Sequence, residues 1–406
     1  MLRKSRSVRV LDLKAVYVFL FVLAASFPGL TLFSGQVIKQ FETYSLAQSM
    51  ARVGWNPFAT TIPCEGGIRW VLELPIFAGL GGIFATLAPE WPSILPVLVF
   101  GLFLWGLARF RERLAPDSSH LVWIAVAATP VFLRFSTQFL ADPFAVALLL
   151  VGASAFLERK RALAALFFML AVSVKPTVLP SILFFRWAFA PERDARRILP
   201  APLGPWLARE AALTFAFVAP FLAWTLAVKW LGIPSPMHEG GLLALGSDWR
   251  ILGEARFYSK FFVWTVFKGV GVPLALCALV GLRFADERVR RLAAWSAGIV
   301  PYWLIVRHLN VIHDYYSLSF FVPIALLGGF GAEAIAERRP KWIGALRLLL
   351  LIGILQGIGL FVASGRRAAW RPPVGSRPIF CGKEMRGEAL MRRPGAPSES
   401  ADDPAR

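Results

Sequence analysis

The feature that most constrains this chain is a repeated pattern of apolar runs, each roughly 15–22 residues long, separated by short charged loops. Apolar runs of this length match the distance that a helix needs to cross a bilayer. Hydrophobic residues make up 57% of the 406 residues and charged residues only 17%. Because a soluble domain cannot bury that much apolar surface, the sequence predicts an all-α polytopic membrane protein and excludes a soluble enzyme.

The basic residues explain the formal net charge of +19 without a nucleic-acid partner. They fall in short clusters between the apolar runs, as the enrichment of Lys and Arg in cytoplasmic loops predicts. These clusters are residues 109–113, 158–161, 191–197, 283–291 and 337–341. We therefore interpret the positive charge as belonging to cytoplasmic loops, and we expect no nucleic acid among the partners.

Placing every basic cluster in the cytoplasm predicts about eleven transmembrane helices. The chain then has a cytoplasmic N-terminus (1–12), a transmembrane domain (13–363) and a disordered outer tail (364–406). Two large outer loops cover residues 34–92 and 232–268. The predicted spans are 13–33, 93–108, 119–138, 142–157, 162–174, 176–190, 211–231, 269–283, 292–306, 317–336 and 342–363.

The short apolar stretch 74–88 is ambiguous, because Pro75, Glu90 and Pro92 bound it closely. It is either a span or a helix lying at the membrane surface. A further crossing here would put the arginines of 109–113 outside, against the charge rule. We therefore expect interfacial helices in the first outer loop. The basic start of the chain resembles a signal sequence, but no small-residue cleavage site follows, so we interpret 13–33 as an uncleaved first helix.

Polar side chains gather on the predicted outer side, where they are costly at membrane depth and often mark a site. KQFETYSLAQSMARVGWNPF (39–58) carries Lys39 and Glu42 on the polar face of a predicted helix. VLELPIF (71–77) places Glu73 before a proline. RFSTQFLADPF (134–144) contains Arg134 and begins a helix at Asp142. A plain surface helix, a helix start and a helix cap are the structural alternatives for these three motifs.

Two further motifs fall on the same side. VSVKPTVLP (172–180) places Lys175 between two apolar half-spans with no acidic residue nearby in sequence, an arrangement that suits a phosphate; snorkelling to the interface is the alternative. RHLNVIHDYY (307–316) ends in His313, Asp314, Tyr315 and Tyr316, which combine a titratable base, an anion and an aromatic belt. Interface tyrosines alone would be ordinary, whereas the adjacent His-Asp pair favours a site.

In order and spacing, the five motifs resemble membrane-embedded GT-C glycosyltransferases of the family 39 type, which includes protein O-mannosyltransferases and aminoarabinose transferases. The resemblance runs from about residue 10 to residue 336. It implies a GT-C-like bundle that transfers a sugar from a polyprenyl-phosphate carrier to a glycan, lipid or protein acceptor. The reaction would take place on the non-cytoplasmic face, which for a bacterial chain is the outer side of the inner membrane. It would usually proceed with inversion.

The resemblance also implies roles for individual residues. Glu42 takes the place of an acidic residue that acts as general base or orients the acceptor, where many relatives have Asp. Asp142 matches the second acidic motif of the family, and Lys175 matches a basic residue near the lipid phosphate. The segment from His313 to Tyr316 matches a late motif near the donor.

Three further residues are assigned roles beside these. Arg134 is placed to stabilise the leaving phosphate together with Lys175 or His313. Lys39 and Glu73 are assigned to positioning the acceptor or the loop. Because the first outer loop lacks an Asp-x-Asp pair, we expect no obligatory metal and no cofactor beyond the lipid-linked donor.

Two other function classes fit a chain of this composition. A transporter or flippase of lipid-linked substrates would carry charges at mid-bilayer, with paired repeats and broken helices; the predicted spans are nearly free of charge and show no internal repeat. A non-catalytic scaffold of the same fold would bind polyprenyl lipids without transfer, and its acidic residues would be replaceable.

Overall fold

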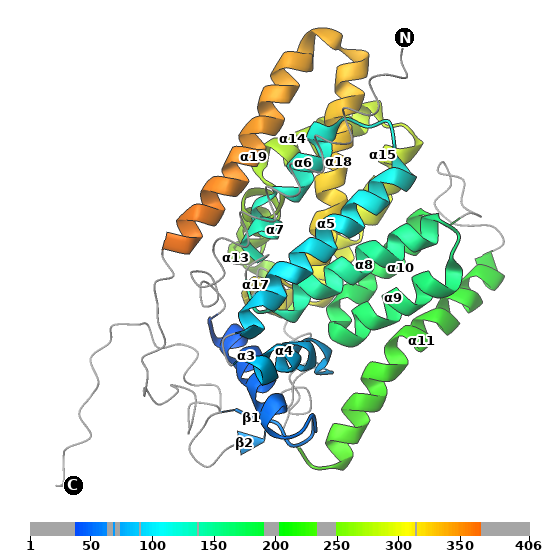
Figure 1. Cartoon of the computed structure of the whole chain (residues 1–406). Coiled ribbons are helices and arrows are strands. Elements are labelled where there is room, and N and C mark those ends of the chain that lie inside the picture. Colours follow the sequence, from blue (N-terminus) through cyan, green and yellow to red (C-terminus); the bar gives the residue numbers. More distant parts are fainter. Residues whose placement is uncertain are drawn as a thin grey trace.

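The computed structural model describes residues 37–62, 68–69, 74–88, 91–135, 138–190, 203–233, 249–312 and 315–366. Within these ranges the chain is a bundle of packed helices (Figure 1). The strands there are β1 (Thr61–Ile62) and β2 (Ile68–Arg69), which pair antiparallel. The all-α prediction is confirmed. The predicted first span and the segment 367–406 lie outside the described residues.

The helices follow the predicted apolar runs in order. Their bounds are α3 (Val37–Arg52), α4 (Ile76–Leu87), α5 (Leu95–Leu114), α6 (His120–Ala127), α7 (Pro130–Phe135), α8 (Ala141–Leu157), α9 (Arg161–Val174), α10 (Leu179–Ala188), α11 (Leu203–Trp230), α13 (Ala255–Phe262), α14 (Val272–Gly281), α15 (Glu287–Ala297), α16 (Ile299–Ile305), α17 (Arg307–Ile312), α18 (Leu318–Arg338) and α19 (Ile343–Arg366). A π-helical segment, η4 (Val263–Val270), continues α13.

Helix α18 is the centre of the bundle. It packs against α6, α8, α14, α15 and α19, and 83% of its most apolar stretch is buried inside the protein. The corresponding fractions are 22% for α11 and 28% for α19, which lie along opposite edges of the molecule (Figure 1). Because α11 and α19 leave most of their apolar surface exposed, that surface is suited to contact lipid.

Three described helices are long and apolar enough to cross a membrane by themselves. They are Gly204–Trp230, Leu318–Arg338 and Pro340–Val362. A fourth crossing is formed if Ala255–Val270 and Val272–Phe284, bent by 101°, count as one broken span. These helices make the chain a membrane protein, whereas the number of eleven spans stays a prediction.

Two predicted spans are interrupted, which corrects the sequence interpretation. The span 119–138 divides into α6 and α7, because Pro130 starts a new helix and disfavours the helical conformation at Thr129. The span 292–306 divides at Gly298 into α15 and α16, and α15 begins earlier, at Glu287, where Asp286 caps it by accepting from the Val289 N–H.

The predicted first outer loop, residues 34–92, contains two helices among its described residues. The motif 39–58 begins with α3, and the short apolar stretch forms α4, 12 residues long. The two helices pack together: Gly82 of α4 lies so close to the Ala47 carbonyl of α3 that an added Cβ would come within 3.0 Å of it. α4 is shorter than a bilayer-spanning helix, so its length fits the predicted interfacial position.

Helix α11 is held near its two ends. Close to its start, Glu210 forms a bidentate ion pair with Arg186 of α10, with Nε–Oε2 and Nη2–Oε1 distances of 2.6 and 2.8 Å. Close to its end, Trp224 stacks on Phe58 of the first loop, with ring centroids 4.8 Å apart. Pro220 lies within the helix and cannot donate a backbone hydrogen bond.

Helices α14 and α18 cross at glycines, with their backbones in direct contact. A Cβ at Gly331 would overlap the Cys277 carbonyl, and one at Gly281 would overlap Gly331 itself. Gly328 meets the Leu274 carbonyl in the same way. Small residues at such a crossing allow the close approach that holds membrane helices together.

Replacing Gly331 by alanine is therefore expected to destabilise the bundle by about 2 kcal/mol, because the added methyl group must push two backbones apart. Gly359→Ala in α19 is the matched control, since nothing lies within 4 Å of its Cβ position. Thermal unfolding of both variants in detergent is the measurement. Equal midpoints for the two variants would contradict the close crossing.

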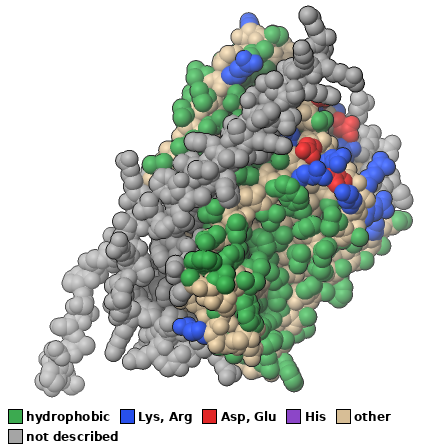
Figure 2. All heavy atoms as spheres, viewed as in Figure 1, with side chains coloured by type: hydrophobic (Ala, Val, Ile, Leu, Met, Phe, Trp, Pro, Cys, Tyr) green, Lys and Arg blue, Asp and Glu red, His purple; other side chains and the backbone are tan. Residues whose placement is uncertain are grey.

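A charged cluster lies at the ends of α5 and α8. Glu158, whose side chain is 7% exposed, pairs with Lys160 at 2.7 Å, Arg109 at 2.8 Å and Arg113 at 3.1 Å. The hydrogen bond to Lys160, with Arg113 and Arg109, holds the pKa of Glu158 below its usual value and outweighs the opposite effect of burial. Figure 2 shows basic and acidic side chains gathered together in one area of the visible face.

Because its pKa is lowered by folding, ionised Glu158 contributes stability that is present at neutral pH and is lost as the pH falls through the lowered pKa. Glu158→Gln is expected to lower the thermal midpoint at about pH 7 and to differ less from wild type below about pH 4. Glu112→Gln, an exposed partner of Arg109, is the control. A pH-independent difference between wild type and the Glu158 variant would refute the assignment.

Candidate functional site

The candidate site begins with two charges at complementary helix ends. Asp142 lies in the first turn of α8, and Lys175 directly follows the last residue of α9. The two helices pack side by side and are joined by a short turn, so the start of α8 lies beside the end of α9. An anion at a helix N-terminus and a cation at a C-terminus are both stabilised by the helix dipoles.

Asp142 and Lys175 form a buried ion pair. The Lys175 Nζ lies 3.6 Å from the Asp142 Oδ2, and the side chains are only 3% and 4% exposed. Lys175 has no acidic residue nearby in sequence, and the fold supplies one by bringing Asp142 to it. A buried charge without a partner is strongly unfavourable, so each of these two residues requires the other.

The tyrosines of the late motif complete this centre. The Lys175 ammonium lies over the Tyr316 ring at 5.2 Å and over the Tyr315 ring at 5.9 Å, distances at which cation–π attraction acts. The two rings stack on each other with centroids 4.8 Å apart. The Tyr302 hydroxyl of α16 donates a hydrogen bond to the Tyr316 carbonyl at 3.0 Å. This bond holds the turn at residues 315–317 in place.

A small cavity of about 10 Å³ lies between these groups, which is room for about one water molecule. Asp142, Lys175, Thr177, Tyr315, Tyr316 and Ser319 contribute to its wall. A carboxylate, an ammonium and two aromatic side chains therefore meet at this cavity. We call Asp142, Lys175, Tyr315 and Tyr316 the Asp–Lys–Tyr centre.

The other predicted residues lie at different distances from the Asp–Lys–Tyr centre. The Arg134 guanidinium lies over the Phe135 ring at 5.1 Å, and Phe135 meets Tyr315 edge-on at 6.3 Å, so Arg134 is linked to the centre through two rings. Lys39 and Glu42 lie in α3, but the described residues do not include their side chains. Glu73, His313 and Asp314 lie outside the described residues.

Helix α3 nevertheless docks close to the Asp–Lys–Tyr centre. The Gln40 Oε1 accepts a hydrogen bond from the Phe139 N–H at 3.0 Å, and Phe139 precedes the start of α8. Tyr44 contacts the Phe139 ring edge-on, with centroids 5.6 Å apart. The helix that contains Glu42 is thus fixed against the segment that leads into Asp142.

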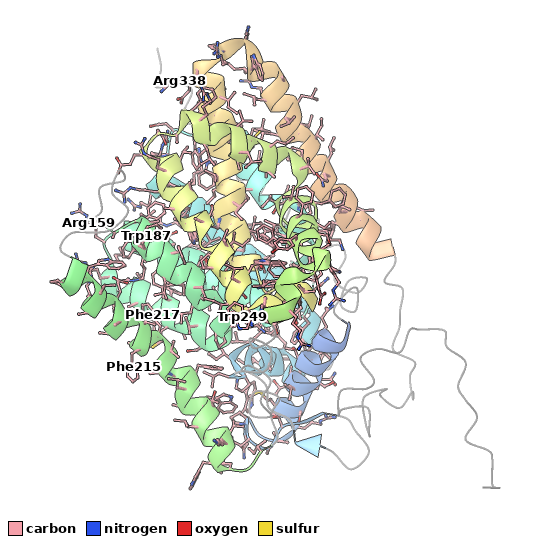
Figure 3. The ribbon with its side chains drawn as sticks, turned by 180° about the vertical axis from the view of Figure 1, so that it is seen from behind. Arg159, Trp187, Phe215, Phe217, Trp249 and Arg338 are labelled. Atoms are coloured by element: carbon pink, nitrogen blue, oxygen red, sulfur yellow. The ribbon has the colours of Figure 1, made fainter. Side chains whose placement is uncertain are left out.

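The sequence analysis missed a second group of buried polar residues beside the Asp–Lys–Tyr centre. Ser317 accepts from the Trp303 Nε1 at 2.7 Å and donates to the Asn310 Oδ1 at 3.2 Å. Arg307, only 1% exposed, stacks on Trp249 at 3.9 Å and donates to the Leu304 carbonyl. In Figure 3, Trp249 lies away from Arg159 and Arg338.

A sequence signal for these residues existed in the motif RHLNVIHDYY. Arg307 and Asn310 are three residues apart, which places them on the same face of a helix. An arginine and an asparagine on one face, at the edge of an apolar run, indicate a buried polar network. The His-Asp pair that follows, His313 and Asp314, is the part of this motif from which the sequence predicts a site, and it lies outside the described residues.

The described part of the Asp–Lys–Tyr centre does not fit a divalent cation. Asp142 is the one carboxylate there, and Lys175 already neutralises it. No group of three or more His, Cys, Asp or Glu side chains comes together among the described residues. Sites for Mg²⁺ and related cations need several oxygen ligands, so no step is assigned to a metal here.

Two solved structures are similar to this fold. The oligosaccharyltransferase of Archaeoglobus fulgidus, crystallised as a complex with zinc and sulfate, superposes with a TM-score of 0.51 and 15% sequence identity, over 86% of this chain and 53% of that chain. The apo form gives a TM-score of 0.48 at 14% identity, over 88% and 56%. No family model and no curated protein sequence matches the chain.

The first of these similarities shows the fold. The chain shares the fold of the matched part of the archaeal oligosaccharyltransferase and spans about half of that chain's length. This similarity agrees with the expected helical membrane fold, while the GT-C and family 39 assignments rest on the resemblance of motifs.

Removing one partner of the buried pair is expected to be costly. Lys175→Met leaves Asp142 buried without its counter-charge and should destabilise the protein by about 3 kcal/mol. The double variant Asp142→Asn/Lys175→Met should lose less than the single variant, because no uncompensated charge remains. Thermal unfolding in detergent measures all variants.

The exposed pair Arg256–Glu254 is the matched control, because its Nε–Oε2 distance is also 3.6 Å but its side chains are 62% and 49% exposed. Arg256→Met should cost less than about 1 kcal/mol. If Lys175→Met were as mild as Arg256→Met, the pair would not be a buried ion pair.

Proposed function

We propose that this protein is a GT-C glycosyltransferase that transfers a sugar from a polyprenyl-phosphate donor to a hydroxyl acceptor. The observation that carries the proposal is the convergence of three motifs distant in sequence. Asp142, Lys175 and the tyrosine pair Tyr315–Tyr316 meet at one end of α8 and α9. They do so in a fold shared with an oligosaccharyltransferase.

The reaction needs one group that accepts the acceptor's proton and another that binds the leaving phosphate. The acceptor oxygen attacks C1 of the sugar while the bond from C1 to the phosphate oxygen breaks, and its electron pair leaves with the polyprenyl phosphate. The acceptor proton passes to a carboxylate. We assign the proton to Glu42 of α3, because Asp142 is held by Lys175.

Lys175 is assigned to the leaving phosphate. As the sugar–phosphate bond breaks, negative charge grows on the phosphate, and a preorganised cation in a water-poor site stabilises it strongly. Asp142 acts as the positioning residue that holds the Lys175 ammonium in place before the donor arrives. Arg134 and His313 are proposed as further contacts of the phosphate, with Asp314 beside them.

The tyrosine pair is suited to the sugar and to the lipid. Stacked rings present an apolar face and hydroxyl groups, so Tyr315 and Tyr316 can pack on the ring of a sugar. Lys39 and Glu73 are proposed to position the acceptor or the loop. The acceptor is a glycan, lipid or protein, and inversion at C1 follows from a single displacement.

The finer features of the proposal come from the sequence. The grouping of basic residues at the other end of α8 and α9 favours placing the Asp–Lys–Tyr centre on the outer side of a bacterial inner membrane, with the N-terminus inside. Eleven spans and a family 39 relationship belong to the same proposal. Transfer is expected to need no divalent metal, so excess EDTA should leave the rate unchanged.

Transport of a lipid-linked substrate and lipid binding without transfer are the rival functions. A transporter would place its charges at mid-bilayer, whereas Asp142 and Lys175 lie at helix ends. A scaffold would tolerate loss of Glu42, whereas it would still need Asp142 as the counter-charge of buried Lys175.

The experiment uses the purified protein in lipid nanodiscs with a panel of radiolabelled polyprenyl-phosphate sugars and an acceptor extract. Glu42→Gln and Asp142→Asn should each lower label transfer by about a hundredfold or more while donor binding persists. Asp117→Asn, an exposed carboxylate of the loop between α5 and α6, should leave the rate unchanged.

Donor binding with no release of label from any sugar would favour the scaffold. Movement of the intact donor across the membrane would favour the transporter. Equal rates for wild type, Glu42→Gln and Asp142→Asn would exclude the assigned acidic site.

A further inference from the structure

A second, larger cavity lies at the opposite end of α8 and α9 from the Asp–Lys–Tyr centre. Its volume is about 670 Å³, enough for a phospholipid headgroup with the first part of its chains. The last residues of α8, the start of α9, the end of α10 and the first half of α11 form its walls. α8 has 17 residues, so the two sites are about 25 Å apart.

The polar part of this cavity is strongly basic. Four arginines and one glutamate line it: Arg159, Arg161, Arg186, Arg209 and Glu210. Glu210 is bound bidentately by Arg186 and is approached by Arg209 at 3.4 Å. The single acidic charge is thereby neutralised within the wall, and a surplus of positive charge remains.

Arg159 and Arg161 carry this surplus. Both are exposed at the turn between α8 and α9, and in the part of the chain that the structure describes neither side chain forms an ion pair or a hydrogen bond. Their neighbours Arg109, Arg113 and Lys160 are satisfied by Glu158. Two guanidinium groups with free donors are suited to the oxygens of a phosphate.

The rest of the cavity wall is apolar. Phe156, Leu157, Phe189 and Leu213 line it, and the adjoining surface of α11 presents Phe215, which is 69% exposed. Figure 3 shows Arg159 and Phe215 on the same side of the molecule, with Phe217 turned into the bundle. The cavity therefore joins a basic rim to an apolar surface that is itself suited to contact lipid.

We propose that this cavity binds an anionic glycerophospholipid, with its phosphate at Arg159 and Arg161 and its acyl chains along α11. A basic pocket between transmembrane helices is a recognised binding mode for anionic headgroups. The apolar wall favours a lipid over free phosphate, which would gain nothing from it. The buried Arg186–Glu210 pair forms the floor, so the bound lipid bridges α9 and α11.

The test is native mass spectrometry of the full-length protein in detergent, titrated with dioleoyl phosphatidylglycerol. Wild type should bind this lipid at least tenfold more tightly than dioleoyl phosphatidylcholine, and the double variant Arg159→Glu/Arg161→Glu should lose at least tenfold of that affinity. Arg283→Glu is the matched control, because Arg283 is an exposed arginine between α14 and α15 that does not line the cavity. It should bind as wild type does.

Three results would overturn the proposal. Equal loss of phosphatidylglycerol binding in Arg283→Glu and in the double variant would indicate a general charge effect. Unchanged binding in the double variant would place the lipid elsewhere. Competition by glycerol 1-phosphate at the same concentration as the lipid would identify a site for a free phosphate. Thermal unfolding of both variants checks that the folded fraction is equal, and the result is independent of glycosyl transfer.

Discussion

The structure depends on one constraint, which is that a charge removed from water must have a partner. Asp142 and Lys175 satisfy it across the start of α8 and the end of α9, and the helix dipoles reinforce both charges. The neighbouring turn then packs its tyrosines on the lysine. At the other end of these helices, Arg186 and Glu210 obey the same rule and attach α11. The two buried pairs thus join α8 to α9 and α10 to α11.

The sequence predicted the positions of helices better than it predicted which side chains contact each other. Apolar periodicity located α4, α8 and α18 to within a few residues, because the spacing of hydrophobic residues depends on local structure alone. The pairing of Lys175 with Asp142 could not be read in this way. The two residues are separated by two helices and a turn, and no local rule fixes which helix ends meet.

The same distinction explains the other differences. The break before Pro130 has a local cause that the charge rule overlooked. Arg307 and Trp249 come from segments far apart in sequence, so their stacking depends on how α17 packs against the 3₁₀ helix Trp249–Gly253. Glu42 was placed on a helix that does form, and Gln40 of that helix reaches the segment before Asp142. The candidate site was predictable as a set of motifs but not as a set of contacts.

The attachment of α11 at both ends has a mechanical consequence. A rod clamped near its ends bends most easily between the clamps, and Pro220, which lacks one backbone hydrogen bond, lies in that interval. Flexing of α11 is therefore expected at Pro220, while its two ends stay attached to α10 and to the segment at Phe58. Through these two attachments, α11 links α10 near its start to the segment around Phe58 near its end.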